Sequence, residues 1–290
     1  MKLSPLEKTI SESMAGPLPT LSEARDLRAL VRAAHGFKQV SMPLLTAPDE
    51  NTKLAKSERP TYGLALSPAR SGGFGNTCPF STAECRKYCV SQAGNGSFSS
   101  CIRGRAAKTD LLANHGAAFR VLLVEELRAA LARERLRARI AHKRFRGIAV
   151  RLNTFSDIRW ELLPIAADLE ALADQGIQFY DYTKFNQGDR PAPSWYHLTR
   201  SYVPGRSTLS DDSPNAVVIS MSVQNRTVKP AIAAGALTLD LATGDRPIVS
   251  GDLSDQRWMD APGSIVVLTR KGSLPRTSSF VVPARVRVDA

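Results

Sequence analysis

The strongest constraint on the fold is a strand, helix, strand alternation in the second half of the chain. Residues 148–152 (Ile-Ala-Val-Arg-Leu) and 177–180 (Ile-Gln-Phe-Tyr) are short, mostly apolar runs, and residues 160–173 between them have helical periodicity. Two parallel neighbouring strands need a crossover connection, which is usually a helix. The alternation therefore predicts a βαβ unit and favours an α/β fold with a parallel-rich sheet.

Further strands and helices are expected on both sides of this unit. Helical periodicity occurs at residues 22–35, 98–113 and 117–143. Strand-like runs occur at residues 62–66, 196–198 and 216–221, and short strands or a helix follow at 232–234, 237–241, 248–249, 265–268 and 280–282. Because no sequence repeat is found, we expect a single α/β domain. Its sheet is expected to be open or TIM-barrel-like, as a complete or a partial barrel.

The N-terminal segment is expected to be helical and to end in a linker. Thr20 and Glu23 have the spacing of a capping box, in which each residue hydrogen-bonds the other's backbone at the start of a helix. Residues 46–60 are polar, which is typical of a linker or a surface loop. We therefore predict a helical extension and linker at residues 1–60.

The rest of the chain, residues 61–290, is expected to form the α/β domain, with a Cys-rich loop at residues 78–101. The 290 residues bury enough apolar surface for folding without disulfide bonds. No stretch approaches the ~18 apolar residues of a membrane helix, and the N-terminus lacks the apolar core of a signal peptide. We therefore expect a cytoplasmic protein with no membrane partner.

All four cysteines of the chain fall in one short stretch. Cys78, Cys85, Cys89 and Cys101 have the spacing C-x6-C-x3-C-x11-C. In a reducing compartment, clustered cysteines are better explained as metal ligands than as disulfides. The Cys85–Cys89 spacing also suits zinc, but the wider gaps favour an iron–sulfur cluster, with [4Fe–4S] as the first choice. Zinc remains the alternative, and four small buried or redox-active thiols remain the ordinary explanation.

Basic residues surround the cysteines and also raise the charge of the whole chain. They would stabilise thiolates or bind phosphate groups, although each one alone is most simply explained as part of an exposed helix face. The net charge of +12 favours a nucleotide or nucleic acid as partner, but Arg-rich coding explains the same charge without any partner. The candidate phosphate-binding or nucleic-acid-binding residues are Arg86, Lys87, Arg103, Arg105 and Lys108.

Polar side chains follow two of the predicted parallel strands. Asn153 and Asp157 come after the strand at 148–152, and Asp181 and Lys184 lie at the end of the next strand. In parallel sheets, ligands bind at the carboxyl ends of the strands. We therefore predict these four as catalytic residues for substrate orientation or proton transfer, while a helix-capping role for Asp157 explains that residue equally well.

Two other charged stretches have simpler explanations. Residues 128–146 carry seven arginines and one lysine, and such a run can lie along a phosphate backbone but is commonly a solvated helix face. Residues 250–260 contain Asp252, Asp255, Arg257 and Asp260. There we expect turn capping and a local ion pair rather than a divalent metal site.

Four motifs in a fixed order resemble a known family. They are the Gly/Asn loop with its cysteines, R-L-N-x-x-S-D-I-x-W-E at 151–161, F-Y-D-Y-T-K at 179–184, and G-D-x-x-D-x-R at 251–257 before G-S-I-V-V-L. Together they resemble the uncharacterised phage protein family typified by mycobacteriophage gene product 88, over about residues 61–283.

The resemblance implies a phage-encoded protein but carries over no activity and no catalytic residue. Cys78, Cys85 and Cys89 match the family motif, whereas the resemblance does not extend to Cys101. A cluster with three cysteine ligands and an open iron would favour chemistry, and one with four would favour structure or electron transfer.

The sequence leads to two hypotheses from different classes. The first is a phage-encoded iron–sulfur enzyme that acts on a nucleotide or nucleic acid in the host cytoplasm. The second is a zinc-stabilised protein that binds nucleic acid or redirects the host without catalysis. The identity of the metal separates them.

Overall fold

The sheet of the protein is long, mostly parallel and open at both ends. The structure is a computed structural model that describes residues 2–48, 59–186, 188–206, 209, 214–221, 225–270 and 274–286. Within these residues the strands follow the order β1-β2-β3-β4-β5-β6-β10-β7, with β9 paired to β6 and β8 paired to β9. The strands are β1 (Leu45–Thr46), β2 (Thr61–Leu64), β3 (Ile148–Arg151), β4 (Ile177–Thr183), β5 (Tyr196–Ser201), β6 (Asn215–Met221), β7 (Leu237–Leu239), β8 (Ile248–Ser250), β9 (Ile265–Thr269) and β10 (Val282–Val286).

The parallel run confirms the central prediction from the sequence. All neighbours from β2 to β6 are parallel, as are the pairs β6–β9, β8–β9 and β6–β10. Only β1–β2 and β7–β10 are antiparallel among the described pairs. The sheet ends at β1 and β7 without pairing them, so it forms no closed barrel in the described part of the chain.

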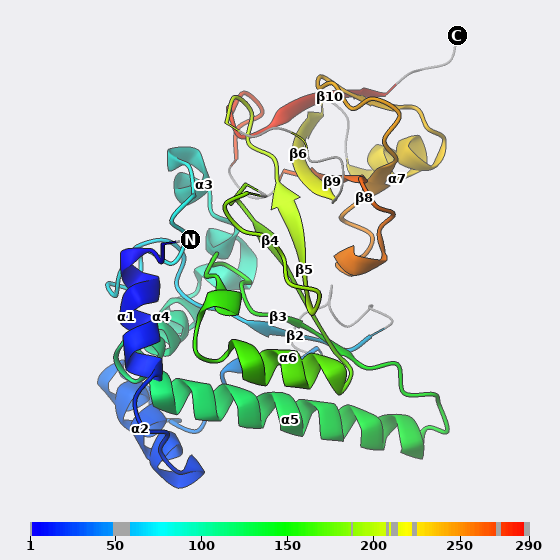
Figure 1. Cartoon of the computed structure of the whole chain (residues 1–290). Helices are drawn as coiled ribbons and strands as arrows, with labels where there is room; N and C mark the ends of the chain where they lie inside the picture. The colour runs from blue at the N-terminus through cyan, green and yellow to red at the C-terminus, as the bar shows by residue number, and fades with distance from the viewer. Residues whose placement is uncertain are drawn as a thin grey trace.

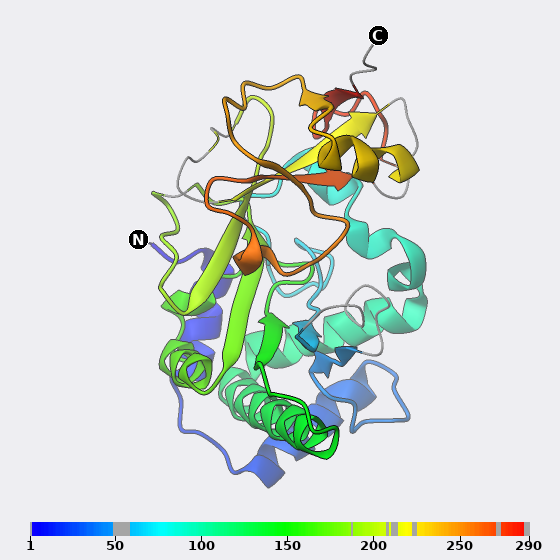
Figure 2. The same ribbon diagram turned by 90° about the vertical axis from the view of Figure 1, so that its right-hand side faces the viewer.

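Helices cover one part of this sheet densely. In Figures 1 and 2, α5 and α6 run beside strands β2 to β5, and α1, α2 and α4 pack near the N-terminal end of α5. The strands β6 to β10 and the short helix α7 form the other end of the molecule (Figure 1). The helices are α1 (Pro5–Met14), α2 (Leu21–Ala34), α3 (Ala83–Lys87), α4 (Ser99–Asn114), α5 (Gly116–Ile140), α6 (Ala166–Asp174) and α7 (Asn225–Ala233).

Two hydrophobic cores correspond to these two regions. The larger core joins buried residues from Leu6 to Leu198 and includes the apolar faces of α1, α2, α4, α5 and α6 against β2 to β5. The smaller core lies between Val217 and Ala284. The larger core fixes the positions of the loops that follow β2, β3 and β4, which is where the candidate site lies.

The predicted helix at 160–173 begins later than expected. Its first residues form a short 3₁₀ helix at Trp160–Leu162, and α6 starts only at Ala166. Pro164 separates the two segments, and Leu163 before it is extended with ψ 159°. A proline has no N–H for the helix and disfavours helical geometry in the residue before it, which explains the break.

The predicted helices at 22–35, 98–113 and 117–143 are confirmed within three residues at each end, as α2, α4 and α5. Helix α1 was not expected, although Ser4 and Glu7 form a capping box and Pro5 occupies its first turn. Most of the predicted linker at 46–60 lies outside the described residues. The boundary at residue 60 stays a prediction.

Candidate functional site

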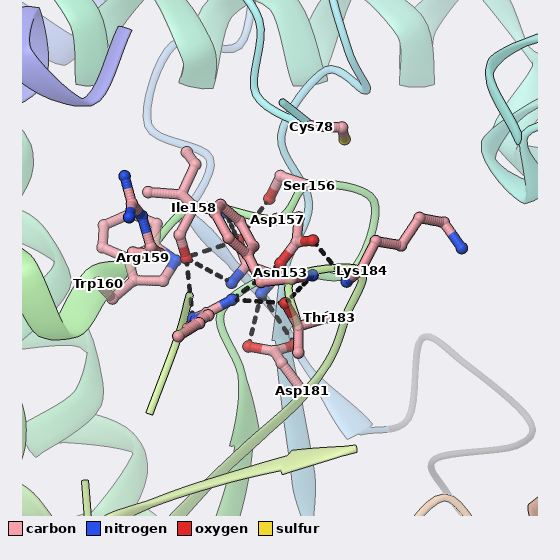
Figure 3. Close-up of polar contacts among 12 residues, drawn as sticks. Cys78, Asn153, Ser156, Asp157, Ile158, Arg159, Trp160, Asp181, Thr183 and Lys184 are labelled. Carbon is pink, nitrogen blue, oxygen red and sulfur yellow. Dashed lines mark hydrogen bonds and ion pairs between the residues drawn. The ribbon is translucent and has the colours of Figure 1, made fainter. Parts of the chain in front are cut away.

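The loops that follow β2, β3 and β4 meet at one edge of the sheet. Because these strands are parallel, their carboxyl ends lie at the same edge, which we call the carboxyl edge. The cysteines follow β2, Asn153 and Asp157 follow β3, and Lys184 follows β4. Figure 3 shows Cys78 beside the residues that follow β3 and β4, with the polar contacts among the residues drawn.

Asn153 is the centre of this arrangement. Its side chain is 2% exposed and uses both ends of the amide. The Nδ2 group donates to the Ile158 carbonyl at 2.9 Å and to the Tyr196 hydroxyl at 3.2 Å. The Oδ1 atom accepts from Ser156 Oγ at 2.8 Å, from the Ile158 N–H at 3.0 Å and from Trp160 Nε1 at 3.2 Å. One amide therefore holds the whole loop after β3 in a single shape.

Asp181 lies directly beneath Asn153 and is fully buried. Its carboxylate accepts from the backbone N–H groups of Leu152 and Asn153 at 3.0–3.1 Å and from the Tyr196 hydroxyl at 2.5 Å. Burial raises the pKa of Asp181 to about 6, although the Arg151 guanidinium opposes this shift. The carboxyl thus titrates near neutral pH.

Asp157 belongs to a buried ion network that sequence reasoning did not find. Its Oδ1 accepts from Arg190 Nη1 at 2.8 Å, and its Oδ2 accepts from the Lys184 N–H at 2.8 Å. Arg190 also binds Glu161 with two hydrogen bonds of 2.7 and 2.9 Å. Burial raises the pKa of Asp157, and the charge of Arg190 opposes that rise. Arg190 lies in a loop without a motif, so no sequence signal marked it.

The Lys184 side chain does not join the other three predicted catalytic residues. Only its backbone N–H binds Asp157. Its Nζ atom lies 4.6 Å from the centre of the Phe280 ring, and Figure 3 shows the side chain extending away from Asp181. The structure therefore brings Asn153, Asp157 and Asp181 into one network and places the Lys184 amine outside it.

The N-terminal helix contributes another buried charge to the same loop. Glu7 in α1 accepts from Arg159 Nη2 at 2.6 Å and from Arg159 Nε and N at 3.0 Å. The pKa of Glu7 is lowered because these hydrogen bonds outweigh its burial. The Ser4–Glu7 capping box was the signal that could have located this helix.

The first cysteine is hydrogen-bonded to the loop that Asn153 organises. Cys78 Sγ donates to the Phe155 carbonyl at 3.3 Å and accepts from the Ala69 N–H at 3.4 Å. The Asp157 N–H donates to the Thr77 carbonyl at 2.8 Å. Figure 3 shows Cys78 on the side of Ser156. The cysteine stretch therefore lies directly against the loop after β3.

The other cysteines occupy three different local structures. Cys85 is in α3, Cys89 precedes a 3₁₀ turn and accepts from Ser91 Oγ at 3.3 Å, and Cys101 is in α4. All four are free thiols, of which Cys101 alone is exposed. Burial raises the pKa of Cys78 to about 12 and also raises that of Cys85. No three His, Cys, Asp or Glu side chains within the described ranges lie close enough together to hold a metal ion.

The predicted phosphate-binding residues are spread over several surroundings. Lys108 Nζ donates to the Leu44 carbonyl at 2.6 Å, and Arg103 lies 5.4 Å from the Phe37 ring, so both contact the N-terminal segment. Lys87 is exposed and lies 5.2 Å from the Tyr88 ring. These three stand apart from the loop that Asn153 organises.

Arg105 and Arg86 lie on the cysteine side of this edge. Arg105 is buried, lies 5.4 Å from the Phe155 ring and is near Cys101 and Cys89. Arg86 donates to the Ser81 carbonyl at 2.7 Å. It also lines a hollow of about 330 Å³, together with Arg206, Glu84 and Phe280. Of the five predicted residues, Arg86 and Arg105 are the ones that lie near the cysteines.

A second polar group lies on the opposite face of β3 to β5 and was missed from the sequence. Arg151 and the Tyr180 hydroxyl both bind Asp255 Oδ2, at 3.1 and 3.0 Å. The Tyr182 hydroxyl and His197 Nε2 are buried without a hydrogen-bond partner among the described residues. Burial lowers the pKa of His197 to about 4, so this imidazole is neutral at pH 7. Four of these five residues lie in the motifs at 151–161, 179–184 and 251–257, but the sequence does not show that they meet.

The local ion pair expected within residues 250–260 is present. Arg257 Nη1 lies 3.2 Å from Asp260 Oδ2 as a local ion pair. Asp252 Oδ2 accepts from the N–H and the hydroxyl of Thr269 at 2.9 and 2.7 Å, which caps the end of β9. This loop therefore serves the fold through its carboxylates.

Comparison with known proteins identifies one family. The model of the gene product 88 family matches residues 42–284. No curated protein and no solved structure matches the chain. In the described part of the chain, none of the helices has the length and apolar character needed to cross a membrane. With most of its length matched, the chain belongs to the gene product 88 family of phage proteins.

Proposed function

We propose that this protein is an iron–sulfur enzyme acting on a nucleotide or nucleic acid, with its cluster held by Cys78, Cys85 and Cys89. One observation carries the proposal. The cysteine stretch is hydrogen-bonded to the loop after β3, through Cys78 Sγ to the Phe155 carbonyl and the Asp157 N–H to the Thr77 carbonyl. A cluster on these cysteines would therefore lie at the carboxyl edge, where parallel sheets bind their ligands.

To hold a cluster, Cys78, Cys85 and Cys89 would have to move closer together and lose their protons. Burial raises the pKa of Cys78 and Cys85, which makes free thiolates unfavourable at neutral pH. A coordinated metal deprotonates a thiol and reverses this preference. The charges of Lys184 and Arg86 lower the pKa of Cys85 and would offset the negative charge of a ligated cluster. When bound, an iron–sulfur cluster supplies electron transfer or an iron with an open ligand position.

Exposure is our basis for choosing the cysteine ligands in this proposal. Cys78, Cys85 and Cys89 are half-buried, whereas Cys101 is exposed in α4. We propose that the first three ligate the cluster and that Cys101 is dispensable. We further propose that the parallel strands β2 to β6 form part of a barrel-like sheet. The cysteines follow the first of these strands.

Asn153, Asp157 and Asp181 act in this proposal by positioning. Their side chains are hydrogen-bonded within the loop or paired with Arg190. They therefore fix the conformation of the loop that faces the cysteines. Burial raises the pKa of Asp157 and raises that of Asp181 to about 6, so both carboxyl groups hold a proton more readily than an exposed carboxyl. Lys184 is the candidate that remains available for a phosphate or a proton.

The substrate class rests on charge. The chain has a net charge of +12. The hollow of about 330 Å³ near the cysteines is lined by Arg86 and Arg206 together with Glu84. Two guanidinium groups suit the oxygens of a phosphate group. All four cysteines are free thiols, which is consistent with the reducing cytoplasm of a host cell as the compartment.

Metal analysis of anaerobically purified protein tests the proposal. We expect brown protein that contains more iron than zinc and that bleaches in air. The rival is a zinc-stabilised, non-catalytic protein, which the three-residue gap between Cys85 and Cys89 favours. Stoichiometric zinc without visible absorbance would support the rival and exclude the cluster. Protein that folds with neither metal would exclude both.

A further inference from the structure

A hollow lined by arginines lies at the other edge of the sheet, where β3 and β4 begin. Its volume is about 570 Å³, and Arg59, Arg135, Arg144 and Arg146 line it. Asp174 is the lining carboxylate, so the lining residues carry a net charge of three positive units (four arginines less one aspartate). We call this the amino-edge hollow. A depression with this charge attracts polyanions.

The floor of the hollow includes two glycines, Gly147 and Gly176, packed against each other. Gly147 has φ +87°, and a Cβ there would lie 2.4 Å from the Gly176 carbonyl oxygen. The same Cβ position is 3.7 Å from Arg59 Nη1, so the Arg59 guanidinium reaches the floor. The glycine is explained by the close approach of these two chain segments.

The neighbouring helix α5 and the residues after it extend the positive surface. The basic residues of the run from α5 to Arg146 are all exposed. Glu134, the acidic residue within the run, is buried and turned inward, where it accepts from the Tyr62 hydroxyl at 2.7 Å and from Arg137 at 2.8 Å. The exposed members are Arg128, Arg133, Arg135, Arg137, Arg139, Lys143, Arg144 and Arg146.

The aromatic content of the hollow favours contact with phosphates over stacking with bases. Phe145 is the aromatic lining residue, and the Arg135 guanidinium lies 5.5 Å from its ring centre. Arg135 Nη2 also donates to the Gln175 carbonyl at 2.6 Å, which fixes the guanidinium at the rim. Binding of single strands relies on aromatic side chains that bases can stack on. A covered ring does not offer that surface.

We infer that the amino-edge hollow binds the sugar–phosphate backbone of a duplex nucleic acid. The strand β4 spans residues 177–183, and at ~3.3 Å per residue it separates the two edges by roughly 20 Å. With one phosphate per ~3.4 Å along a strand, about six nucleotides are needed to cover that distance. This step rests on the proposed function. If one nucleic acid reaches from the amino-edge hollow to the carboxyl edge, the substrate at the carboxyl edge is a polynucleotide rather than a mononucleotide.

The test is a salt titration of binding by the full-length protein. The probes are fluorescent DNA and RNA duplexes of about 20 base pairs, measured by anisotropy between about 50 and 200 mM salt. The variant Arg135→Gln/Arg144→Gln removes two charges from the hollow. We expect the log–log salt slope to fall by about two and the affinity at low salt to fall by more than about tenfold. The two probes show whether DNA or RNA is preferred.

The control removes two charges elsewhere. Arg25 and Lys38 are exposed and lie outside the hollow, so Arg25→Gln/Lys38→Gln has the same net charge as the test variant. Thermal unfolding shows that both variants are folded. If the two variants lose affinity equally, or if the wild-type protein fails to bind at low salt, the inference is wrong. Tighter binding of the matching single strands, measured in the same way, would also overturn it.

Iron content separates this inference from the proposed function. The test variant should contain as much iron as the wild-type protein, because the hollow lies at the edge opposite the cysteines. A wild-type protein without iron that still binds duplexes through the hollow would refute the cluster and leave the hollow standing. A wild-type protein that contains iron but does not bind duplexes through the hollow would refute only the inference about the hollow.

Discussion

The two edges of the sheet use charged side chains in opposite ways. At the carboxyl edge the charges of Asp157, Glu161 and Arg190 are buried and bound to one another. At the amino edge the arginines of the hollow, such as Arg135 and Arg144, are exposed to solvent. Buried charges must be paired, because the loss of hydration is large. The charges of the first edge therefore fix the shape of the loops, while guanidinium groups of the second edge are exposed at the surface.

The largest effect on stability is expected from the buried network. Arg190→Met leaves Asp157 and Glu161 without the guanidinium that binds both of them. Breaking a buried pair in this way costs about 3–5 kcal/mol of unfolding free energy. The same change at the amino edge, Arg144→Met, should alter stability by less than about 0.5 kcal/mol. Urea unfolding of both variants measures the difference.

Similar losses of unfolding free energy in Arg190→Met and Arg144→Met would show that the two edges use their arginines in the same way. In that case, the arginines of the amino edge would serve the fold, and their charge would not identify a docking surface. A small loss for Arg190→Met would instead show that water or local rearrangement satisfies the two carboxylates.

A smaller effect, which depends on pH, is expected from Asp181. Its pKa is raised to about 6 in the folded protein, against an ordinary value of 3.8. The folded state then binds the proton more tightly than the unfolded state, so stability falls as pH rises from about 4 to about 6. The difference in unfolding free energy amounts to about 3 kcal/mol across that window.

The variant Asp181→Asn isolates this contribution. It removes the titration while keeping an oxygen that accepts from the backbone of Leu152 and Asn153. As pH rises from 4 to 6, the unfolding free energy of the wild-type protein should therefore fall relative to that of the variant. Parallel stability curves for the two proteins would show that Asp181 does not titrate in this range.

Local patterns predicted much of the fold. The helical periodicity at 117–143 and the apolar run at 148–152 became α5 and β3, and the βαβ order produced the parallel run. The helix at 160–173 was wrong at its start because Pro164 overrides periodicity. The pairing of β6 with β5, β9 and β10 was beyond prediction, since contacts between distant segments leave no local signal.

The candidate site was predictable to the extent that it depends on strand ends. Asn153, Asp157 and Asp181 were predicted to meet there, and they belong to one network of hydrogen bonds. Arg190 and Glu7 were not predicted, because each reaches the site from a segment whose sequence shows no site motif. The direction of the Lys184 side chain depends on Phe280, a contact that spacing along the chain does not show.

The central claim is a cluster held by three cysteines at the carboxyl edge, and iron content in single cysteine variants tests it most directly. We expect anaerobically purified Cys78→Ser, Cys85→Ser and Cys89→Ser each to lose the iron and to unfold more readily, because two remaining thiolates cannot hold the centre. Cys101 is exposed in α4, so Cys101→Ser should keep most of the iron and serves as the matched control. Equal loss in all four variants would contradict the three-ligand account in favour of a closed four-cysteine site, and iron retained in all four would contradict a cysteine-held cluster altogether.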